Sequence, residues 1–203
     1  MHTNEDGVQR HKQRMQRKKA IVDEKIAAAT IERGVVVLIT GNGKGKSSSG
    51  FGMVMRTLGH GYKAAVVQFI KGAMDCGEHF FLQTRCPELE FHVMGTGFTW
   101  ETQDKSKDIA AAQTLWTEAK RLLADASVQL VLLDELTYML KYRYLDGDEV
   151  LAAIRNRPAH QHVIVTGRGA TPELKDIADT LSVIDDVKHA FRAGVKAQKG
   201  VEW

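Results

Sequence analysis

The sequence predicts an α/β fold in which a mostly parallel sheet of about six strands carries helices on both faces. Strand-like apolar runs alternate with helical segments along most of the chain, which is typical of this fold class. The runs 35–39 and 128–133 are apolar without alternation, as strands buried on both faces are. A glycine-rich loop also joins the first run to a helix, so a ligand loop is expected at the sheet edge.

Hydrophobic periodicity and capping residues place the individual elements. The predicted strands are residues 35–39, 64–70, 90–94, 128–133, 162–166 and 180–184. The predicted helices of this alternating part are residues 47–58, 78–85, 106–124, 136–143, 147–156 and 172–178. Thr171, Pro172 and Glu173 are typical of a helix start, with a capping hydroxyl, a proline and an acid in sequence. Gly59 and Gly61 are expected to end the first of these helices.

The amino-terminal segment lies outside the alternating pattern. Residues 8–33 are predicted to be helical, with apolar side chains at helical spacing in the second half, and Gly34 is expected to end this helix. The sequence therefore predicts a basic helical arm, residues 1–33, followed by an α/β domain, residues 34–203.

Composition and charge narrow the class of protein. Hydrophobic residues make up 43% and charged residues 26% of the 203-residue chain, and no apolar run approaches the roughly 20 residues of a membrane span. The polar, basic start does not resemble a secretory signal, so we expect a cytoplasmic protein without a membrane partner. Residues 9–19 contain six Lys or Arg and no acid. A solvated tail explains them better than nucleic-acid binding, because no aromatic residue is interleaved for base stacking.

A glycine-rich loop carries the clearest functional signal. Its glycines let the backbone turn several N–H groups toward an anion, and the helix that follows adds its positive end. Lys46 supplies a charge for phosphate oxygens and Ser47 a hydroxyl for a divalent metal. The usual pattern has glycine where Thr40 stands, and Lys44 is an additional lysine. The expected ATP- or GTP-binding residues of the loop are Thr40, Gly41, Asn42, Gly43, Lys44, Gly45, Lys46, Ser47 and Ser48.

Polar residues also follow other predicted strands, where ligands of parallel sheets bind. Asp134 and Glu135 follow the strand 128–133; one of them is expected to ligate a metal, directly or through water, with a helix-capping acid pair as the alternative. Arg168 lies in a glycine turn after the fifth strand and is a candidate for pairing with phosphate oxygens. An ordinary surface arginine is the alternative, and Arg56 carries the same ambiguity.

Two aromatic residues, Phe98 and Trp100, stand in the glycine-containing loop expected after the third strand. Large aromatic side chains are costly to leave exposed in a loop. They either fold back onto the core or line a pocket for a large, flat, apolar ligand. A simple kinase does not need such a pocket, so this pair bears on the choice of function.

The motifs, taken in order, resemble those of one family, the P-loop ATP:corrinoid adenosyltransferases. The loop by itself indicates only a nucleotide, whereas the ordered set is highly specific and runs over nearly the whole chain. Ser47 stands where threonine is frequent in the family, and both residues offer a hydroxyl. The matching segments are TGNGKGK (40–46), VVQFIKG (66–72), TGFTWETQ (96–103), LLDELTY (132–138), TGRG (166–169), VKHAF (187–191) and GVKAQKG (194–200).

The resemblance implies a P-loop NTPase-like fold and a defined reaction. Co(I) of a corrinoid attacks C5′ of ATP, and the whole triphosphate leaves as tripolyphosphate, in cobalamin biosynthesis and salvage. Lys44 and catalytic Lys46 would stabilise the leaving charge together with Mg²⁺ or Mn²⁺ held by Ser47 and Glu135. Whether Asp134 also touches the metal stays open. ATP and the corrinoid are thus the expected substrates.

By the same resemblance, Phe98 and Trp100 would act in catalysis by packing under the corrin and excluding water and the lower axial ligand. The resemblance further implies a homodimer in which the arm closes over the partner's active site, and a reduced flavoprotein as electron donor. One alternative is a P-loop NTPase or phosphotransferase that hydrolyses ATP to ADP, with Glu135 activating water. A nucleic-acid-binding ATPase that uses the basic arm is the other. Neither alternative explains the aromatic pair.

Overall fold

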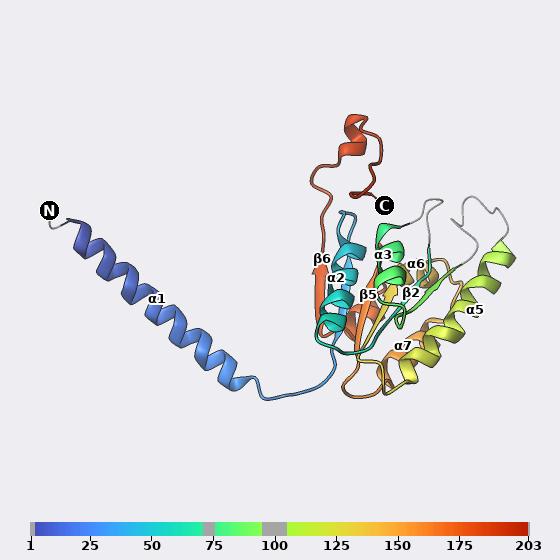
Figure 1. Cartoon of the computed structure of the whole chain (residues 1–203), viewed down its shortest axis with the longest axis horizontal. Helices are drawn as coiled ribbons and strands as arrows, with labels where there is room; N and C mark the ends of the chain where they lie inside the picture. Colours follow the sequence, from blue (N-terminus) through green and yellow to red (C-terminus); the bar gives the residue numbers. More distant parts are fainter. Residues whose placement is uncertain (1–2, 71–75, 95–104, 203) are drawn as a thin grey trace. The chain divides into compact units, whose positions relative to one another are not determined.

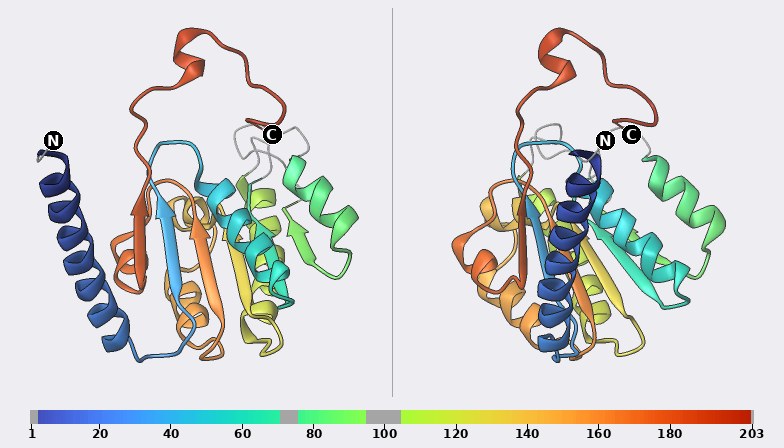
Figure 2. Two further views of the ribbon diagram at one scale, coloured as in Figure 1. Left: turned by 60° about the vertical axis from the view of Figure 1, so that its left-hand side comes forward. Right: turned by 90° about the vertical axis from the view of Figure 1, so that its left-hand side faces the viewer.

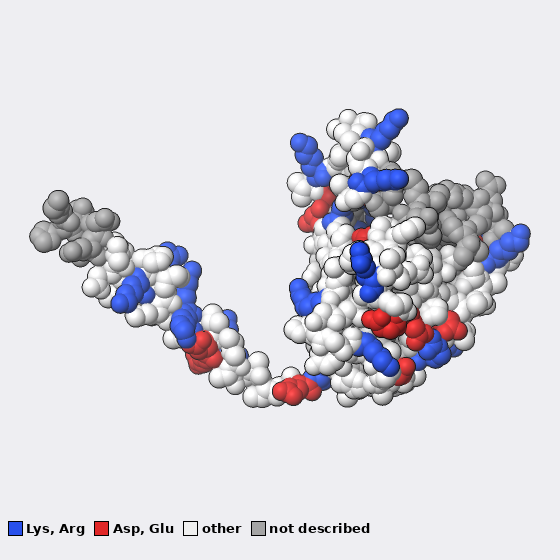
Figure 3. Space-filling view, in the orientation of Figure 1, with Lys and Arg blue, Asp and Glu red and all other residues white. Residues whose placement is uncertain are grey.

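A computed structural model describes residues 3–70, 76–94 and 105–202 of the chain. The chain divides into two units, residues 1–32 and 33–203. The first unit contains one helix, α1 (Thr3–Ala28), along which Lys and Arg side chains are displayed (Figure 3). This helix begins and ends about five residues before the predicted 8–33. Thr30 and Ile31, which follow its end, are β-branched and poor helix formers.

The second unit is built on a parallel sheet (Figure 1). The order of its strands is β3-β2-β4-β5-β1-β6. The strand ranges confirm the six predicted strands with shifts of up to two residues at some ends, and 162–166 is recovered unchanged. The strands are β1 Val36–Thr40, β2 Ala64–Gln68, β3 Glu90–Val93, β4 Leu130–Asp134, β5 His162–Thr166 and β6 Thr180–Val183. The predicted α/β architecture is therefore present.

Helices cover both faces of the sheet (Figure 2). On one face α2 and α3 pack on Val66, Leu132 and Ile164. On the other face α5 to α8 enclose a larger core that includes Val131 and Leu133. Both sets of β4 side chains are therefore buried, which explains why this strand is apolar without alternation. The helix ranges are α2 Lys46–Gly59, α3 Gly77–Arg85, α5 Lys105–Ala124, α6 Leu136–Lys141, α7 Gly147–Arg155 and α8 Pro172–Asp176.

The helix ends follow local rules that the sequence already carries. Thr171 caps α8 by accepting a hydrogen bond from the N–H of Leu174 at 3.3 Å. Gly59 is the last residue of α2, and Gly61 turns the chain with φ of 76°. A short 3₁₀ helix, η1 (Ala190–Ala193), was not predicted. No helix in the described part of the chain is long and apolar enough to cross a membrane.

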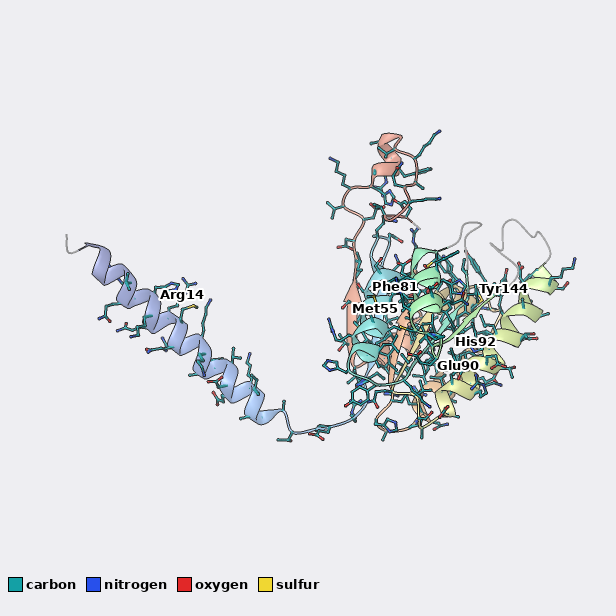
Figure 4. All side chains as sticks on the ribbon, viewed as in Figure 1. Arg14, Met55, Phe81, Glu90, His92 and Tyr144 are labelled. Atoms are coloured by element: carbon teal, nitrogen blue, oxygen red, sulfur yellow. The ribbon has the colours of Figure 1, made fainter. Side chains whose placement is uncertain are left out.

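The edge strand β3 carries charged groups rather than a bare apolar face. Glu90 and His92 project from it (Figure 4), and Arg121 of α5 donates a hydrogen bond to Glu90. These interactions hold the pKa of the Glu90 carboxyl below its usual value. Charge on an edge strand disfavours pairing with another chain.

Gly34 is required where the chain enters β1. A Cβ atom there would lie 2.1 Å from the backbone oxygen of Gln161, and the Gly34 N–H donates to Ala159 O at 2.7 Å. The chain entering β1 therefore passes in van der Waals contact with the chain entering β5.

We expect Gly34→Ala to lower the free energy of unfolding by about 1–3 kcal/mol, because the backbone must shift to admit the methyl group. Gly52→Ala is the matched control: Gly52 lies within α2 with no atom within 4 Å of the added Cβ, so stability should be equal or up to about 1 kcal/mol higher. Urea unfolding followed by circular dichroism measures both. Equal stability of Gly34→Ala and wild type would show that the chains entering β1 and β5 are not tightly packed at Gly34.

Candidate functional site

A cavity of about 680 Å³ lies at the carboxyl edge of the sheet. The predicted strand-end groups from β1, β4 and β5 meet there, together with the end of β2 and the start of α3. The last described residues of the chain close another part of its wall. The lining consists of residues 43–48, Phe51, Gln68, Ile70, residues 76–78, Asp134, Glu135, Arg168 and residues 200–202.

The glycine-rich loop is shaped by the chain that follows β6. Gly41 and Gly45 have φ of 103° and 109°, values that favour glycine. A Cβ atom on Gly41 would lie 2.4 Å from Ile184 O, and one on Gly43 would lie 2.5 Å from Asp185 O. The Gly43 N–H also donates to Ile184 O at 2.8 Å. Two of the loop glycines therefore serve backbone packing as well as conformation.

Lys46 stands at the start of α2 with its side chain buried. Its Nζ donates to Gly43 O at 2.6 Å, so the ammonium group is held against the loop. Burial lowers its pKa, and the charge of Glu135 opposes that shift. Ser47 and Ser48 follow Lys46 and line the same cavity. These side chains are where a phosphate-binding loop would need them.

The amino end of α2 is open to an anion. Its N-cap residue, Gly45, has no side chain that could bond the first helical N–H groups, which leaves them for a ligand. Three predicted residues stand further back and do not line the cavity. Thr40 is buried at the end of β1, Gly41 is partly buried and Asn42 is exposed.

Asp134 is almost fully buried and fully engaged. Its Oδ1 accepts from the Thr166 hydroxyl at 2.6 Å and its Oδ2 accepts from Gln68 Nε2 at 2.9 Å. The Thr166 hydroxyl in turn accepts the backbone N–H of Glu135 at 3.0 Å. One carboxylate thus ties β2, β4 and β5 together and orients the residue that follows.

Glu135, unlike Asp134, has a carboxylate oxygen without a hydrogen-bond partner among the described residues. It has φ of 58°, uncommon for a non-glycine residue, and this oxygen, Oε2, is buried. Burial and then the charge of Asp134 raise its pKa to about 7, against the lowering effect of Lys46 and Arg168. Strain and a perturbed carboxyl in one cavity residue point to a functional site.

A divalent cation fits these donors. An unpartnered buried carboxylate oxygen on Glu135 and the Ser47 hydroxyl line one cavity, and both are oxygen ligands of the kind Mg²⁺ prefers. Within residues 3–70, 76–94 and 105–202 no three His, Cys, Asp or Glu side chains cluster as a complete metal cage. Such a cation would therefore take much of its coordination from a ligand's phosphates and from water.

The two candidate arginines have different positions. Arg168 lines the cavity, and its turn is fixed by the Thr137 hydroxyl, which donates to Arg168 O at 2.9 Å. Arg56 is exposed in the last turn of α2 and does not line the cavity. It is ten residues beyond Lys46, about 15 Å along the helix axis. The structure does not bring Arg56 to this cavity, so its expected nucleotide contact has no support.

Sequence reasoning missed several cavity residues. Cys76, which was not singled out, lines the cavity, and its thiol donates to Glu78 Oε2 at 3.0 Å. Burial raises the pKa of this thiol to about 11, so the thiol stays protonated at neutral pH. Gln68 and Glu202 were also not singled out. Glu202 pairs with Lys44 of the loop, and nothing in the local sequence signals that contact.

Phe98 and Trp100 lie outside the described residues. The predicted aromatic floor for a corrinoid therefore stays a prediction.

Comparisons with known proteins identify the family of this chain. Residues 32–203 match the family described as ATP:corrinoid adenosyltransferase BtuR/CobO/CobP, and residues 4–26 match the one described as Cob(I)alamin adenosyltransferase N terminal. This chain belongs to the ATP:corrinoid adenosyltransferase family. The resemblance inferred from the motifs is confirmed, and so is the predicted enzyme class, an ATP-dependent corrinoid adenosyltransferase.

Individual relatives are similar over almost the whole chain. The corrinoid adenosyltransferase of Pseudomonas aeruginosa is 61% identical over 195 residues, 96% of either chain. That of Escherichia coli K12 is 51% identical over 195 residues, 96% of this chain and 98% of the relative. Among solved structures, the flagellar accessory protein FlaH from Methanocaldococcus jannaschii has a TM-score of 0.51 at 13% identity, covering 75% of this chain and 72% of that one. This last likeness shows the fold alone.

The raised pKa of Glu135 predicts a pH-dependent stability. The folded state holds the Glu135 proton up to about pH 7, whereas the unfolded state releases it near pH 4.5. Stability should therefore fall as pH rises between these values, by up to about 3 kcal/mol. Glu135→Gln removes this dependence. The free energy of unfolding of the variant, relative to that of wild type, should therefore be higher at pH 8 than at pH 5.

Urea unfolding in metal-free buffer at the two pH values measures this difference. Glu173→Gln, on the exposed face of α8, reports the general effect of removing a carboxylate. A constant difference between Glu135→Gln and wild type at both pH values would contradict the prediction.

Proposed function

We propose that this adenosyltransferase holds the triphosphate of ATP in the carboxyl-edge cavity as the leaving group of adenosyl transfer to a corrinoid. The observation that carries the proposal is the joint placement of the glycine-rich loop, Arg168 and Glu135 around one cavity. In the reaction, the Co(I) electron pair forms a bond to C5′ of the ribose. The C5′–O bond breaks, and its electron pair leaves with tripolyphosphate.

The chain's cations fit a leaving group that gains negative charge. Lys46 is buried against the loop, and Lys44 and Arg168 add positive charge to the same cavity. Preorganised charges of this kind stabilise a transition state because they need no reorganisation during the reaction. The Lys46 ammonium donates one hydrogen bond to Gly43 O, and its other two N–H groups can donate to phosphate oxygens without releasing it.

We assign the metal site to Ser47 and Glu135. A bound Mg²⁺ or Mn²⁺ would neutralise part of the triphosphate charge. Glu135 provides an unpartnered oxygen, whereas both oxygens of Asp134 are already hydrogen-bonded. Asp134 therefore positions Glu135, and we do not propose it as a direct ligand.

The corrinoid side of the site rests on the family resemblance. Phe98 and Trp100 would pack under the corrin and exclude the lower axial ligand, which makes Co(II) easier to reduce. On the same basis we propose a cytoplasmic homodimer that receives electrons from a reduced flavoprotein, with residues 1–33 as an arm over the partner's site.

One anaerobic assay tests the reaction. Protein, ATP, Mg²⁺ and chemically reduced cob(I)alamin are mixed, the corrinoid spectrum is followed and the phosphate product is identified. We expect a light-sensitive adenosyl-cobalt species together with intact tripolyphosphate. ADP and phosphate without a spectral change would instead indicate an ordinary P-loop hydrolase.

Lys46→Ala should reduce the rate of adenosyl transfer by at least about 100-fold, because it removes a buried charge beside the leaving group. Lys175→Ala, on the exposed α8, is the matched control and should behave as wild type. Near-normal turnover by Lys46→Ala would mean that the loop does not hold the leaving group.

Trp100→Ala should impair turnover that starts from Co(II) at least about tenfold more than turnover that starts from Co(I). The reason is that its proposed role is in the reduction step. Initial rates with a reducing system and with chemically prepared cob(I)alamin give the two values. Equal losses from both starting states would remove the side chain from that step.

A further inference from the structure

The C-terminal segment, residues 184–202, begins and ends at the glycine-rich loop. At its beginning, Ile184 binds the loop backbone through the N–H of Gly43 and the carbonyl of Thr40, both at 2.8 Å. At its end, Glu202 pairs with Lys44. Between these points the segment rises from the end of β6, turns and comes back toward the carboxyl edge of the sheet (Figure 2). Both ends of the segment therefore touch the loop that is proposed to hold triphosphate.

The end of the segment is set by a local turn. The Glu202 N–H donates to Gln198 O at 2.8 Å, and Gly200 takes φ of 79° within this turn. The turn places residues 200–202 in the wall of the cavity. Glu202 is thus a cavity residue, with 23% of its side chain exposed, and Lys44 is 42% exposed.

The segment is held mainly by polar contacts. Val187, Phe191 and Val201 are 89%, 75% and 70% exposed, so little apolar surface fixes the segment to the domain. An ion pair that is this exposed adds little stability. Segments with few buried apolar contacts open at low free-energy cost, so the Glu202 end can leave the loop without unfolding the sheet.

Glu202 and a triphosphate would both bind the ammonium group of Lys44. Both present anionic oxygens to its ammonium group, and a triphosphate brings several negative charges close to the Glu202 carboxylate. The negative charges of the triphosphate and of the Glu202 carboxylate would repel each other. The two anions therefore compete for Lys44.

We propose that Glu202 is an internal competitor of the triphosphate: nucleotide binding displaces it from Lys44, and it recaptures Lys44 as tripolyphosphate leaves. The proposal rests on the proposed function in one respect, namely that the loop holds the triphosphate. The C-terminal segment thereby limits the affinity of the site for its own product.

Calorimetric titration with sodium tripolyphosphate in the presence of Mg²⁺ tests the competition directly. Glu202→Gln should bind tripolyphosphate about two- to fivefold more tightly than wild type, the range expected for removing one exposed ion pair. Glu173→Gln is the charge-matched control on α8 and should equal wild type. Unchanged or weaker binding by Glu202→Gln would overturn the proposal.

A double-variant cycle separates competition from simple repulsion. If Glu202 competes for Lys44, the gain from Glu202→Gln should disappear when Lys44→Met is also present. A gain of the same size in the Lys44→Met background would show repulsion without competition and would overturn the proposed exchange.

Limited trypsin digestion measures the movement itself. Lys196 and Lys199 are exposed cleavage sites in the segment, so displacement of Glu202 should speed cleavage there when tripolyphosphate is added. Glu202→Gln should be cut at the faster rate without ligand. Slower cleavage on adding tripolyphosphate would overturn the proposal. Failure of wild type to bind tripolyphosphate at all would instead reject the leaving-group site of the proposed function.

Discussion

The buried carboxylate of Asp134 is the interaction on which the site depends. A carboxylate that leaves water must have its oxygens hydrogen-bonded, or its burial becomes prohibitive. Gln68 from β2 and Thr166 from β5 supply these bonds, so the carboxyl ends of three adjacent strands are held in register. The Thr166 hydroxyl then accepts the N–H of Glu135, which fixes the left-handed backbone there.

Glu135 takes its chemical character from that arrangement. Its own burial and then the charge of Asp134 raise the pKa of its carboxyl to about 7, and Lys46 and Arg168 limit the shift. A carboxyl group with a pKa of about 7 changes its charge within the physiological pH range. The close packing around Glu135 also requires glycine at position 167, because a Cβ atom there would lie 2.1 Å from Thr137 Oγ1.

The glycine-rich loop also lines the cavity. It is hydrogen-bonded to the chain that follows β6. The carbonyl oxygen of Ile184 accepts a hydrogen bond from the N–H of Gly43, and the Glu202 carboxylate pairs with the ammonium group of Lys44. The loop is therefore less free for an anion than its sequence alone suggests. Lys44 and Lys46 already have partners within the protein, Glu202 and Gly43 O, whereas the first N–H groups of α2 have no side-chain cap.

The sequence by itself determined the α/β class, the strand positions, the phosphate loop and the family, because these depend on local periodicity, glycine spacing and ordered motifs. It also placed Lys46, Ser47, Glu135 and Arg168 correctly at one sheet edge, since parallel strands end together. Only the tertiary structure showed that both oxygens of Asp134 are hydrogen-bonded by Gln68 and Thr166, that Arg56 does not line the cavity, and that Glu202 reaches Lys44. These facts depend on contacts between residues far apart in the chain, and local patterns carry no information about which distant side chain fills a given hydrogen bond.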